Sequence, residues 1–282
     1  MRLILTLLCR NEADIVGSMV AFHLSRGVDL IVATDNGSSD GTTALLEAYQ
    51  RQGVLRLLRE SSRTHDQAVW VTRMARLAAE EHGADWVINS DADEFWWPAS
   101  GDLKIELAAV PASVQALRVE RRNFLPPALA VAVDLPFHQR QTIRERRSLN
   151  SLGQPLPPKV CHRAMAAISV GDGNHVVTLD GQAVPAPSCA GLEILHFPVR
   201  SYSQLERKIR EGTEALASNK RVSSKVGSTW RHIYSEHMLG GTLPTYYDGL
   251  RPTPTALEAG LQSGELVNDR RLQQALAMHP SS

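Results

Sequence analysis

The stretch "ADWVINSDADEFWW" (residues 84–97) joins a short apolar run to three carboxylates and then to three aromatic rings. Its apolar run, residues 85–89, is typical of a strand that is covered on both faces. Asp91 and Asp93 follow this run with one residue between them. Burying unpaired carboxylates is costly unless a cation or hydrogen-bond donors compensate. The stretch therefore predicts a partner for its negative charge at the end of a buried strand.

Strand-like and helix-like patterns alternate through the sequence that precedes this stretch. Short apolar runs typical of buried strands lie at residues 3–8, 30–34, 54–58 and 85–89. Apolar residues recur at helical spacing between them, at residues 14–26, 42–51 and 66–82. Such alternation forms right-handed βαβ units, so we expect an α/β fold with a mainly parallel central sheet that helices cover on both faces.

The pattern weakens after residue 110, where prolines divide the chain into short pieces. The remaining strand predictions are residues 117–124, 159–170 and 192–197. A helix is expected from Tyr202 onward, followed by a loop over residues 240–255 and a last amphipathic helix. The C-terminal part of the chain is therefore expected to be mainly helical.

The composition limits the class of protein. A chain of 282 residues can bury a sizeable core and is expected to form one large domain, or one domain with an appendage. A formal net charge of zero predicts no nucleic-acid partner. No apolar run is long enough to span a bilayer. Three cysteines without a CxxC pair fit a reducing compartment, so we expect a cytoplasmic protein.

Polar clusters follow three of the predicted strands. They are "CRNE" (9–12), "DNGSSDGT" (35–42) and "SDADE" (90–94). Open parallel sheets bind ligands at the carboxyl ends of their strands, so we expect these clusters to meet at one edge. Asp35 would accept hydrogen bonds from a nucleoside there, and Gly37 would allow close backbone approach. The alternative interpretation of the second cluster is a polar turn that opens a helix.

Asp91 and Asp93 form an Asp-x-Asp pair at a strand end. Hard oxygen ligands at this spacing suit Mg²⁺ or Mn²⁺, which in turn binds a diphosphate. The alternative interpretation is an exposed acidic loop, but the flanking apolar and aromatic residues argue against full exposure. We therefore expect a divalent cation as cofactor.

Three motifs in order resemble a known family. "LLCRNEADIV" (7–16), "VDLIVATDNGSSDGTTALLE" (28–47) and residues 84–97 are similar to successive signatures of family 2 type glycosyltransferases with the GT-A fold, in the branch that carries Asp-Ala-Asp-Glu-Phe. Later blocks resemble that branch more weakly. They are "KVCHRAM" (159–165), "GDGNHVV" (171–177) and "ILHFPVRSYSQLERKI" (194–209).

The resemblance implies a Rossmann-like GT-A domain over residues 1–199. Its nucleotide-binding half covers about residues 1–100 and its acceptor half about residues 101–199, with a helical C-terminal extension at 200–282. The reaction it implies is the transfer of a sugar from a nucleotide-diphosphate donor, in particular a UDP-sugar, to a glycan or a lipid-linked acceptor.

The resemblance also assigns roles to residues of this chain. The nucleotide-binding candidates are Arg10, Asn11, Glu12, Asp35, Asn36, Gly37, Arg73 and Asp91. The metal ligands are Asp91, Asp93 and His196, and His175 competes with His196 for the third position. A core histidine is the alternative interpretation of His196.

The catalytic base is less clearly marked, because the acidic pair common in inverting members is not found. Asp172 is the candidate in its place, together with His175. Glu94, Trp96 and Trp97 are assigned to acceptor binding, since aromatic rings offer flat faces to a sugar; the alternative for both tryptophans is the core.

The segment 200–225 holds seven basic and three acidic residues. Usually such a surface is merely solvated; the alternatives are contact with the leaving diphosphate or peripheral contact with anionic lipid at the inner face of a membrane.

Other function classes also stay open. A sugar-nucleotide pyrophosphorylase would carry a glycine-rich basic loop after its first strand, where this chain has "CRNE" (9–12). A phosphatase with an Asp nucleophile would place its Asp pair after the first strand, not the fourth. A non-catalytic glycan-binding module on the same fold is the remaining alternative.

Overall fold

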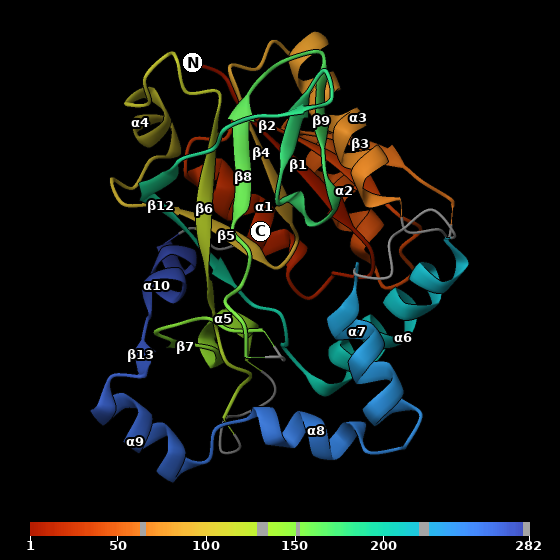
Figure 1. Cartoon of the computed structure of the whole chain (residues 1–282), viewed down its shortest axis with the longest axis vertical. Helices are drawn as coiled ribbons and strands as arrows, with labels where there is room; N and C mark the ends of the chain where they lie inside the picture. Colours follow the sequence, from red (N-terminus) through yellow and green to blue (C-terminus); the bar gives the residue numbers. More distant parts are fainter. Residues whose placement is uncertain (63–65, 129–134, 151–152, 220–225, 279–282) are drawn as a thin grey trace.

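The computed structural model describes residues 1–62, 66–128, 135–150, 153–219 and 226–278. The strands of its central sheet are β1 (Leu3–Cys9), β2 (Leu30–Asp35), β3 (Leu55–Arg59), β4 (Trp86–Asp91), β5 (Glu94–Pro98), β6 (Ala116–Asn123), β8 (Lys159–Arg163) and β12 (Ser188–His196). Within the described residues, these eight strands follow the order β3-β2-β1-β4-β8-β6-β12-β5 (Figure 1). Two small sheets, β11-β10-β9 and β13-β7, lie outside it. Their strands are β7 (Ile143–Glu145), β9 (Ile168–Val170), β10 (Val177–Leu179), β11 (Gln182–Ala183) and β13 (Leu266–Asn268).

Helices flank the central sheet and form most of the C-terminal region. In the first half they are α1 (Val16–Ser25), α2 (Thr42–Arg51), α3 (Gln67–Glu80) and α4 (Leu103–Ala108). Further on they are α5 (Phe137–Arg140), η1 (Asp172–Asn174), α6 (Tyr202–Ser218), α7 (Ser228–Ile233), η2 (Tyr234–Met238), α8 (Leu243–Leu250), α9 (Pro254–Ser263) and α10 (Arg271–Met278). None of the described helices has the length and apolar character needed to span a bilayer.

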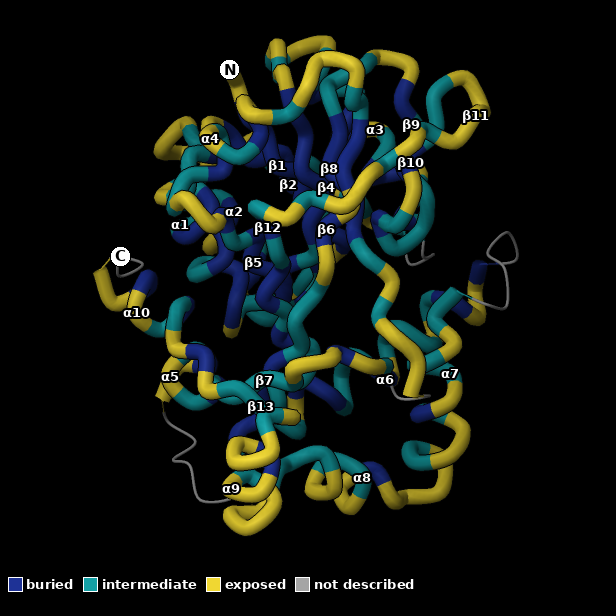
Figure 2. Tube along the Cα trace, turned by 60° about the vertical axis from the view of Figure 1, so that its left-hand side comes forward, coloured by how far each residue is buried: buried dark blue, intermediate teal, exposed yellow. Residues whose placement is uncertain are grey.

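The two faces of the sheet bury separate apolar clusters. Val16 and Met19 of α1 pack with Leu5 of β1 in one cluster. Met74 of α3 packs with Ile4 of β1 in the other, because successive side chains of a strand point to opposite faces. Figure 2 shows the buried sheet strands surrounded by more exposed segments. The expected α/β class, with helices on both faces and a helical C-terminal region, is confirmed.

Strand direction brings many strand ends to one edge. β1 pairs in parallel with β2 and β4, and β2 with β3. β4 and β6 both pair antiparallel with β8, and β12 runs parallel to β6 but antiparallel to β5. The carboxyl ends of β1, β2, β4, β6 and β12 therefore lie at the same edge as the amino ends of β8 and β5.

The sheet is strongly curled. Asp91 ends β4 and Glu94 begins β5, although four strand spacings separate β4 from β5 in the sheet order. A flat sheet would place these strands about 19 Å apart. Three residues of chain span at most about 11 Å. The sheet must therefore curl until β5 returns to the carboxyl end of β4, which brings Asp91, Asp93 and Glu94 to a concave edge.

Two predictions for the second half of the chain are wrong. Residues 159–170 form two strands in different sheets, β8 and β9. Residues 240–255 are not a loop, because α8 and the first turn of α9 lie there. Pro244 and Pro254 occupy first-turn positions of these helices, where a proline fits without losing a hydrogen bond. The last region also holds more than one helix, since α9, β13 and α10 follow one another.

The C-terminal region packs in two places. Leu205, Ile209, Ile233 and Leu243 form an apolar cluster of their own between α6, α7 and α8. The last helix, α10, contributes Leu272, Ala275 and Leu276 to the main core instead. The boundary at residue 200 stays a prediction, but α10 packs into the core of the first part.

The buried His23 is expected to make stability depend on acid. Its Nε2 accepts from the backbone N of Trp96 at 3.1 Å, so its Nδ1 carries the proton and donates to the carbonyl of Met19. Burial lowers the pKa of His23 from 6.5 to about 4. The unfolded chain therefore binds a proton before the folded chain does, and stability is lost as pH falls from the unfolded pKa toward the folded one.

We expect His23 to remove about 2 kcal/mol from the free energy of unfolding between about pH 7 and about pH 5. The check is urea unfolding at both pH values for the wild type and for His23→Gln, whose amide oxygen can accept the same hydrogen bond. The wild type should lose more stability than the variant. Equal losses would show that His23 does not titrate in this way.

Candidate functional site

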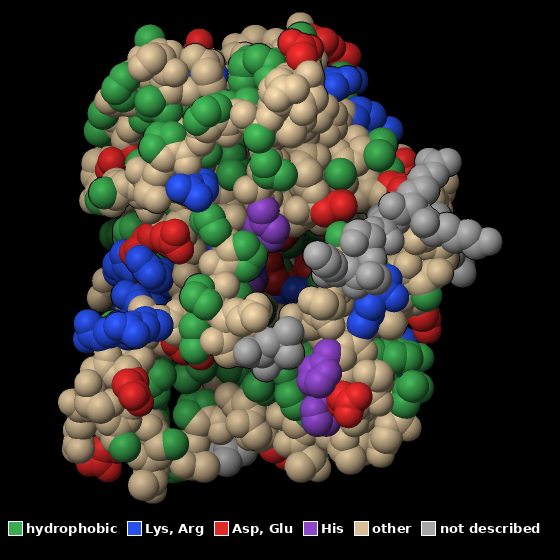
Figure 3. All heavy atoms as spheres, in the orientation of Figure 1, with side chains coloured by type: hydrophobic (Ala, Val, Ile, Leu, Met, Phe, Trp, Pro, Cys, Tyr) green, Lys and Arg blue, Asp and Glu red, His purple; other side chains and the backbone are tan. Residues whose placement is uncertain are grey.

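The three polar clusters meet at the curled edge of the sheet, as the sequence predicts. Register places Cys9 beside Asp35 and Leu8 beside Asp91. It also places His196 beside Asn123 and beside Glu94. Figure 3 shows a hollow near the centre of one face, with acidic, basic and histidine side chains at its bottom and beside it.

Asp91 is held by donors from three elements. Its Oδ2 accepts from Nζ of Lys159 at 2.5 Å. Its Oδ1 accepts from the amides of Gln67 and Asn174, each at 3.3 Å. Burial alone raises the pKa of Asp91, but the Lys159 ammonium outweighs this effect and lowers it. Asp91 is therefore an ionised carboxylate with fixed orientation.

Asp93 lies between a lysine and a histidine. Its Oδ2 accepts from Nζ of Lys208 at 2.6 Å, and its Oδ1 lies 3.7 Å from Nε2 of His196. Burial alone raises the pKa of Asp93, but Lys208 outweighs this and holds it well below its usual range. In the structure a lysine from α6 neutralises this carboxylate, and the divalent cation stays a prediction.

The orientation of His196 makes its Nε2 an acceptor. Its Nδ1 lies 2.6 Å from Oδ1 of Asn123, whose amide nitrogen donates to the carbonyl of Leu149 at 3.3 Å. Nδ1 therefore carries the proton. Burial lowers the pKa of His196 to about 3, so the ring is neutral. Two acceptors, Nε2 of His196 and Oδ1 of Asp93, face each other with no proton between them.

This pair suits a divalent cation, because an imidazole nitrogen and a carboxylate oxygen are both ligands of Mn²⁺. In the described part of the chain, no group of three His, Cys, Asp or Glu side chains lies close enough to bind a metal. Mg²⁺ commonly takes one or two carboxylates and completes its shell with water and substrate phosphates. The residues present fit a site of this kind, in which the protein supplies few of the ligands.

Glu94 belongs to a buried charge network below the site. Its side chain is 0% exposed, and its Oε1 lies 3.2 Å from Nζ of Lys159 and 3.8 Å from Nη1 of Arg121. Burial, only partly offset by Lys159, raises the pKa of Glu94 to about 7. Lys159 thus bridges Glu94 and Asp91. Glu94 helps to hold Lys159 in place beside Asp91. Its predicted contact with an acceptor does not fit this burial.

The loop after β1 is anchored by α6 and its preceding turn. Arg200 is 0% exposed and donates to Glu12 and to both carboxylate oxygens of Asp14. Glu211 of α6 accepts from the amide of Asn11 at 2.8 Å and from Nε of Arg10 at 3.1 Å. Arg10, Asn11 and Glu12, predicted to bind a nucleotide, are therefore all tied to the C-terminal region.

The polar side chains of the loop after β2 are hydrogen-bonded within the loop and to residues beside it. Asp35 accepts from Ser38 through both the backbone N at 3.0 Å and the hydroxyl at 2.6 Å, and from the hydroxyl of Thr43. Asn36 donates to the carbonyl of Ser62 at 2.6 Å. Gly37 has a φ of 68°, a left-handed conformation that favours glycine. Nucleotide contact by Asp35, Asn36 and Gly37 stays a prediction, while the structure gives the first two a role in shaping the loop.

The turn at η1 reaches the same edge. The backbone N of Gly173 donates to Gln67 at 3.1 Å, and Asn174 contacts Asp91 as described. Nδ1 of His175 donates to the carbonyl of Pro158 at 2.8 Å, because a carbonyl can only accept. Burial, followed by the charge of Lys159, lowers the pKa of His175 to about 4. His175 is therefore neutral, and its Nε2 carries no proton.

Two predicted site residues, Trp96 and Arg73, lie away from the site. Trp96 is 0% exposed and belongs to the main core, so its predicted contact with an acceptor is wrong. Arg73 lies on the exposed side of α3, opposite its buried stripe. Among the described residues, no hydrogen bond or ion pair joins Arg73 to the site.

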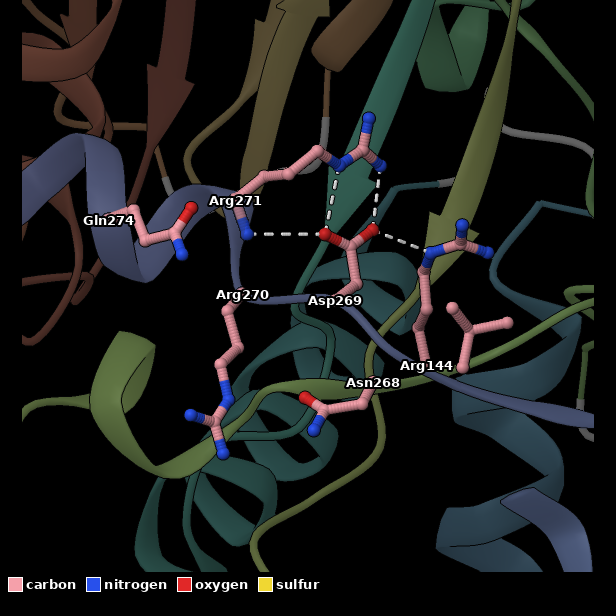
Figure 4. Close-up of a pocket in the computed structure, with 7 residues that line it drawn as sticks. Arg144, Asn268, Asp269, Arg270, Arg271 and Gln274 are labelled. Atoms are coloured by element: carbon pink, nitrogen blue, oxygen red, sulfur yellow. Dashed lines mark hydrogen bonds and ion pairs between the residues drawn. The ribbon is translucent and has the colours of Figure 1, made fainter. Parts of the chain in front are cut away.

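Trp97 is packed between α1 and α10. Its ring stacks on Phe22 with centroids 5.8 Å apart, and the guanidinium groups of Arg26 and Arg271 lie 5.2 Å from its centroid. Arg271 is fixed in turn by Asp269, which also accepts from Arg144 (Figure 4). Figure 4 shows Arg270 pointing away from this network. The structure thus favours packing for Trp97, and acceptor binding by it stays a prediction.

Sequence reasoning missed several residues of the site. They are Gln67, Arg121, Asn123, Lys159, Asn174, Arg200 and Lys208, the last of which is the ion-pair partner of Asp93. A polar residue at the end of a predicted apolar strand was the available signal for Asn123 and Lys159. Lys208 and Arg200 were counted only within the basic segment 200–225, of which residues 220–225 lie outside the described part. Arg200, Arg207 and Lys208 turn inward to acidic groups, and a membrane contact through this segment stays a prediction.

Comparisons with known proteins find partial similarity. No protein-family model matches the chain. The lipopolysaccharide core biosynthesis glycosyltransferase LpsC of Rhizobium meliloti (strain 1021) is 31% identical over 120 residues. This match covers 42% of the chain and 42% of the length of LpsC.

Solved structures give overall matches at low identity. TarS 1–349 of S. aureus in complex with UDP has a TM-score of 0.43 and 11% identity, and the match covers 99% of this chain and 92% of that one. The mannosyltransferase PcManGT of Pyrobaculum calidifontis in complex with GDP-Man and Mn²⁺ has a TM-score of 0.39 and 14% identity, with 98% and 79% covered.

Proposed function

We propose that this protein is a glycosyltransferase of the family 2 type with a GT-A domain, which transfers a sugar from a nucleotide-diphosphate donor to a glycan or lipid-linked acceptor. The observation that carries the proposal is the meeting of the three motif loops at one curled edge, where Asp93 and His196 turn two acceptors toward each other. The similarity to LpsC over 120 residues supports it. A UDP-sugar is the donor we expect.

The candidate residues would bind different parts of the donor and its cation. Arg10, Asn11, Glu12 and the loop of Asp35 would surround the nucleoside. Asp93 and His196, with Asp91 beside them, would hold Mn²⁺ or Mg²⁺, and that cation would offset the charge on the diphosphate as it leaves.

In the transfer, the acceptor hydroxyl bonds to the anomeric carbon, the bond from that carbon to the diphosphate breaks, and the hydroxyl proton passes to a base. His175 is the base we propose, because its ring is neutral and its Nε2 is unprotonated while Nδ1 donates to the carbonyl of Pro158. Asp172 is the second candidate, since it lies in the same turn.

The test is nucleotide binding. A melting-temperature screen with UDP and GDP, each with and without Mn²⁺, should show a rise with UDP that is larger when Mn²⁺ is present, since a ligand of the native state stabilises it. Release of UDP from a UDP-sugar then separates an enzyme from a non-catalytic binding module. A nucleoside triphosphate with a sugar phosphate as the productive pair would indicate the pyrophosphorylase alternative.

His196 gives the sharpest prediction on the metal. Because its Nε2 is unprotonated and faces Asp93, His196→Ala should raise the Mn²⁺ concentration needed for half-maximal UDP binding by at least about tenfold. Excess Mn²⁺ should restore part of the binding. The measurement is a Mn²⁺ titration at fixed UDP, read by fluorescence or calorimetry.

A core histidine would behave differently. In that case His196→Ala would lower the melting temperature and leave the Mn²⁺ requirement unchanged. Asn123→Ala is the matched variant, because it removes the acceptor that fixes Nδ1 but keeps the imidazole. It should raise the requirement less than His196→Ala does.

A further inference from the structure

Helix α6 holds Lys208 against the site from a fixed backbone. Leu205 and Ile209 on one side of the helix pack in the C-terminal apolar cluster. On a neighbouring face, Lys208 donates to Asp93 and Glu211 binds the loop after β1. Since these contacts and the apolar packing both hold the helix, a change of partner by Lys208 needs movement of its side chain alone.

The two lysines at the site differ in that freedom. The side chain of Lys159 is 2% exposed and is fixed between two carboxylates, those of Asp91 and Glu94. The side chain of Lys208 is 23% exposed and has one carboxylate partner in the described part of the chain, Asp93. A lysine has a flexible four-carbon stem and three donors, so Lys208 can reach a neighbouring anion without movement of the helix.

Lys208 and a divalent cation would compete for the same carboxylate. Nζ of Lys208 occupies Oδ2 of Asp93, and the other oxygen, Oδ1, faces His196. A cation between Oδ1 and His196 would place two like charges on one carboxyl group, which is unfavourable at short range. A diphosphate removes this conflict, because its oxygens offer the ammonium a new partner.

We propose that Lys208 couples cation binding to donor binding. In the free protein it neutralises Asp93 and opposes a divalent cation that arrives alone. When the donor arrives, Lys208 turns to a phosphate oxygen and leaves Asp93 to the cation. This inference rests on the proposed function, and it adds that each ligand strengthens the binding of the other.

The charges around Lys208 agree with such an exchange. Asp93 and Glu12 stabilise its charged form, and Arg200 opposes it. Taken together, Asp91, Asp93, Glu94, Glu12 and Asp14 are balanced to within one charge by Lys159, Arg121, Arg200 and Lys208. A divalent cation alone would change the net charge of this group by two, whereas a cation together with the two negative charges of a sugar-linked diphosphate leaves it unchanged.

The test is the variant Lys208→Met, which keeps the length of the stem and removes the charge. We measure by calorimetry the Kd of Mn²⁺ alone and the Kd of UDP in the presence of a chelator. The variant should bind Mn²⁺ about tenfold more tightly and UDP about tenfold more weakly. A residue that merely supports the fold would weaken both ligands, so the opposite signs identify the exchange.

Two control variants accompany it. Lys208→Arg keeps the charge, so its affinity for Mn²⁺ alone should stay close to that of the wild type. Lys104→Met removes a lysine that pairs with Asp29 at 2.6 Å outside the site, and it should change neither Kd. If Lys208→Met is poorly folded, the wild type provides a second measurement: pyrophosphate should tighten Mn²⁺ binding about tenfold.

Failure of this inference differs from failure of the proposed function. If the wild type binds UDP but Lys208→Met binds Mn²⁺ no more tightly than the wild type, the exchange is wrong and the function stands. If the wild type binds no nucleotide with or without Mn²⁺, the proposed function fails. The exchange with a donor then falls with it, even where Mn²⁺ binding tightens in the variant.

Discussion

Asp93→Asn should lower kcat/KM by about 10³-fold or more while the fold persists. The asparagine keeps the size of the side chain and one oxygen, but it removes the charge that Lys208 neutralises in the free protein and that the proposed cation requires. Lys208 is partly exposed, so its ammonium can turn to solvent and the fold does not lose a deeply buried ion. The measurement is release of UDP from a UDP-sugar over a range of Mn²⁺ concentrations, with the melting temperature as a check on folding.

Asp269→Asn is the matched control. Asp269 is also a buried aspartate paired with cations, Arg144 and Arg271, but it lies in the C-terminal network outside the site. This variant should lose stability and keep its kcat/KM. Near-normal turnover of Asp93→Asn, or an equal loss in both variants, would contradict the assignment of Asp93.

The first half of the fold follows from local sequence pattern. The predicted strands at 3–8 and 85–89 correspond to β1 and β4, and the predicted helix at 42–51 to α2. These elements are located by their apolar periodicity, which can be recognised without knowing which strands pair. The second half depends on contacts between distant residues. The break between β8 and β9 depends on packing, because the two strands belong to different sheets. Pro244 and Pro254 stand at the start of α8 and α9, and a proline fits the first turn of a helix as well as a loop, so the prolines alone do not distinguish the two.

The site residues also divide into those that local sequence identifies and those that it does not. Asp91 and Asp93 are recognisable because charge next to a buried strand needs compensation wherever it occurs. Their partners are not recognisable, because Lys159 and Lys208 lie 68 and 115 positions away along the chain. Local sequence therefore predicts that a cation is needed, and only the curled sheet with α6 across its edge shows which cations the chain supplies.

Arg200 carries the largest expected effect on stability. Arg200→Met keeps most of the apolar stem but leaves Glu12 and Asp14 without their shared cation. Removing one partner of a buried ion pair costs about 3–5 kcal/mol. We expect the lower end, about 3 kcal/mol, because Asp14 is 41% exposed and can be hydrated, whereas Glu12 is 15% exposed. Urea unfolding of both proteins gives the difference.

Two comparisons decide whether the lost charge is the cause. Arg210→Met removes an arginine nearby on α6 whose partner, Glu206, is exposed, so its loss in free energy of unfolding should stay below about 0.5 kcal/mol.

The stability deficit of Arg200→Met relative to the wild type should also shrink in acid. Burial raises the pKa of Glu12 even with Arg200 present, and without Arg200 the pKa should rise further. A carboxyl group with a raised folded pKa stabilises the fold below its unfolded pKa and loses that contribution as pH rises. The variant should therefore be closer to the wild type near pH 4 than near pH 7. A deficit of equal size at both pH values would mean that other contacts of the lost guanidinium, such as its hydrogen bond to the carbonyl of Phe197, and not the unpaired carboxylate of Glu12, limit the stability of this loop.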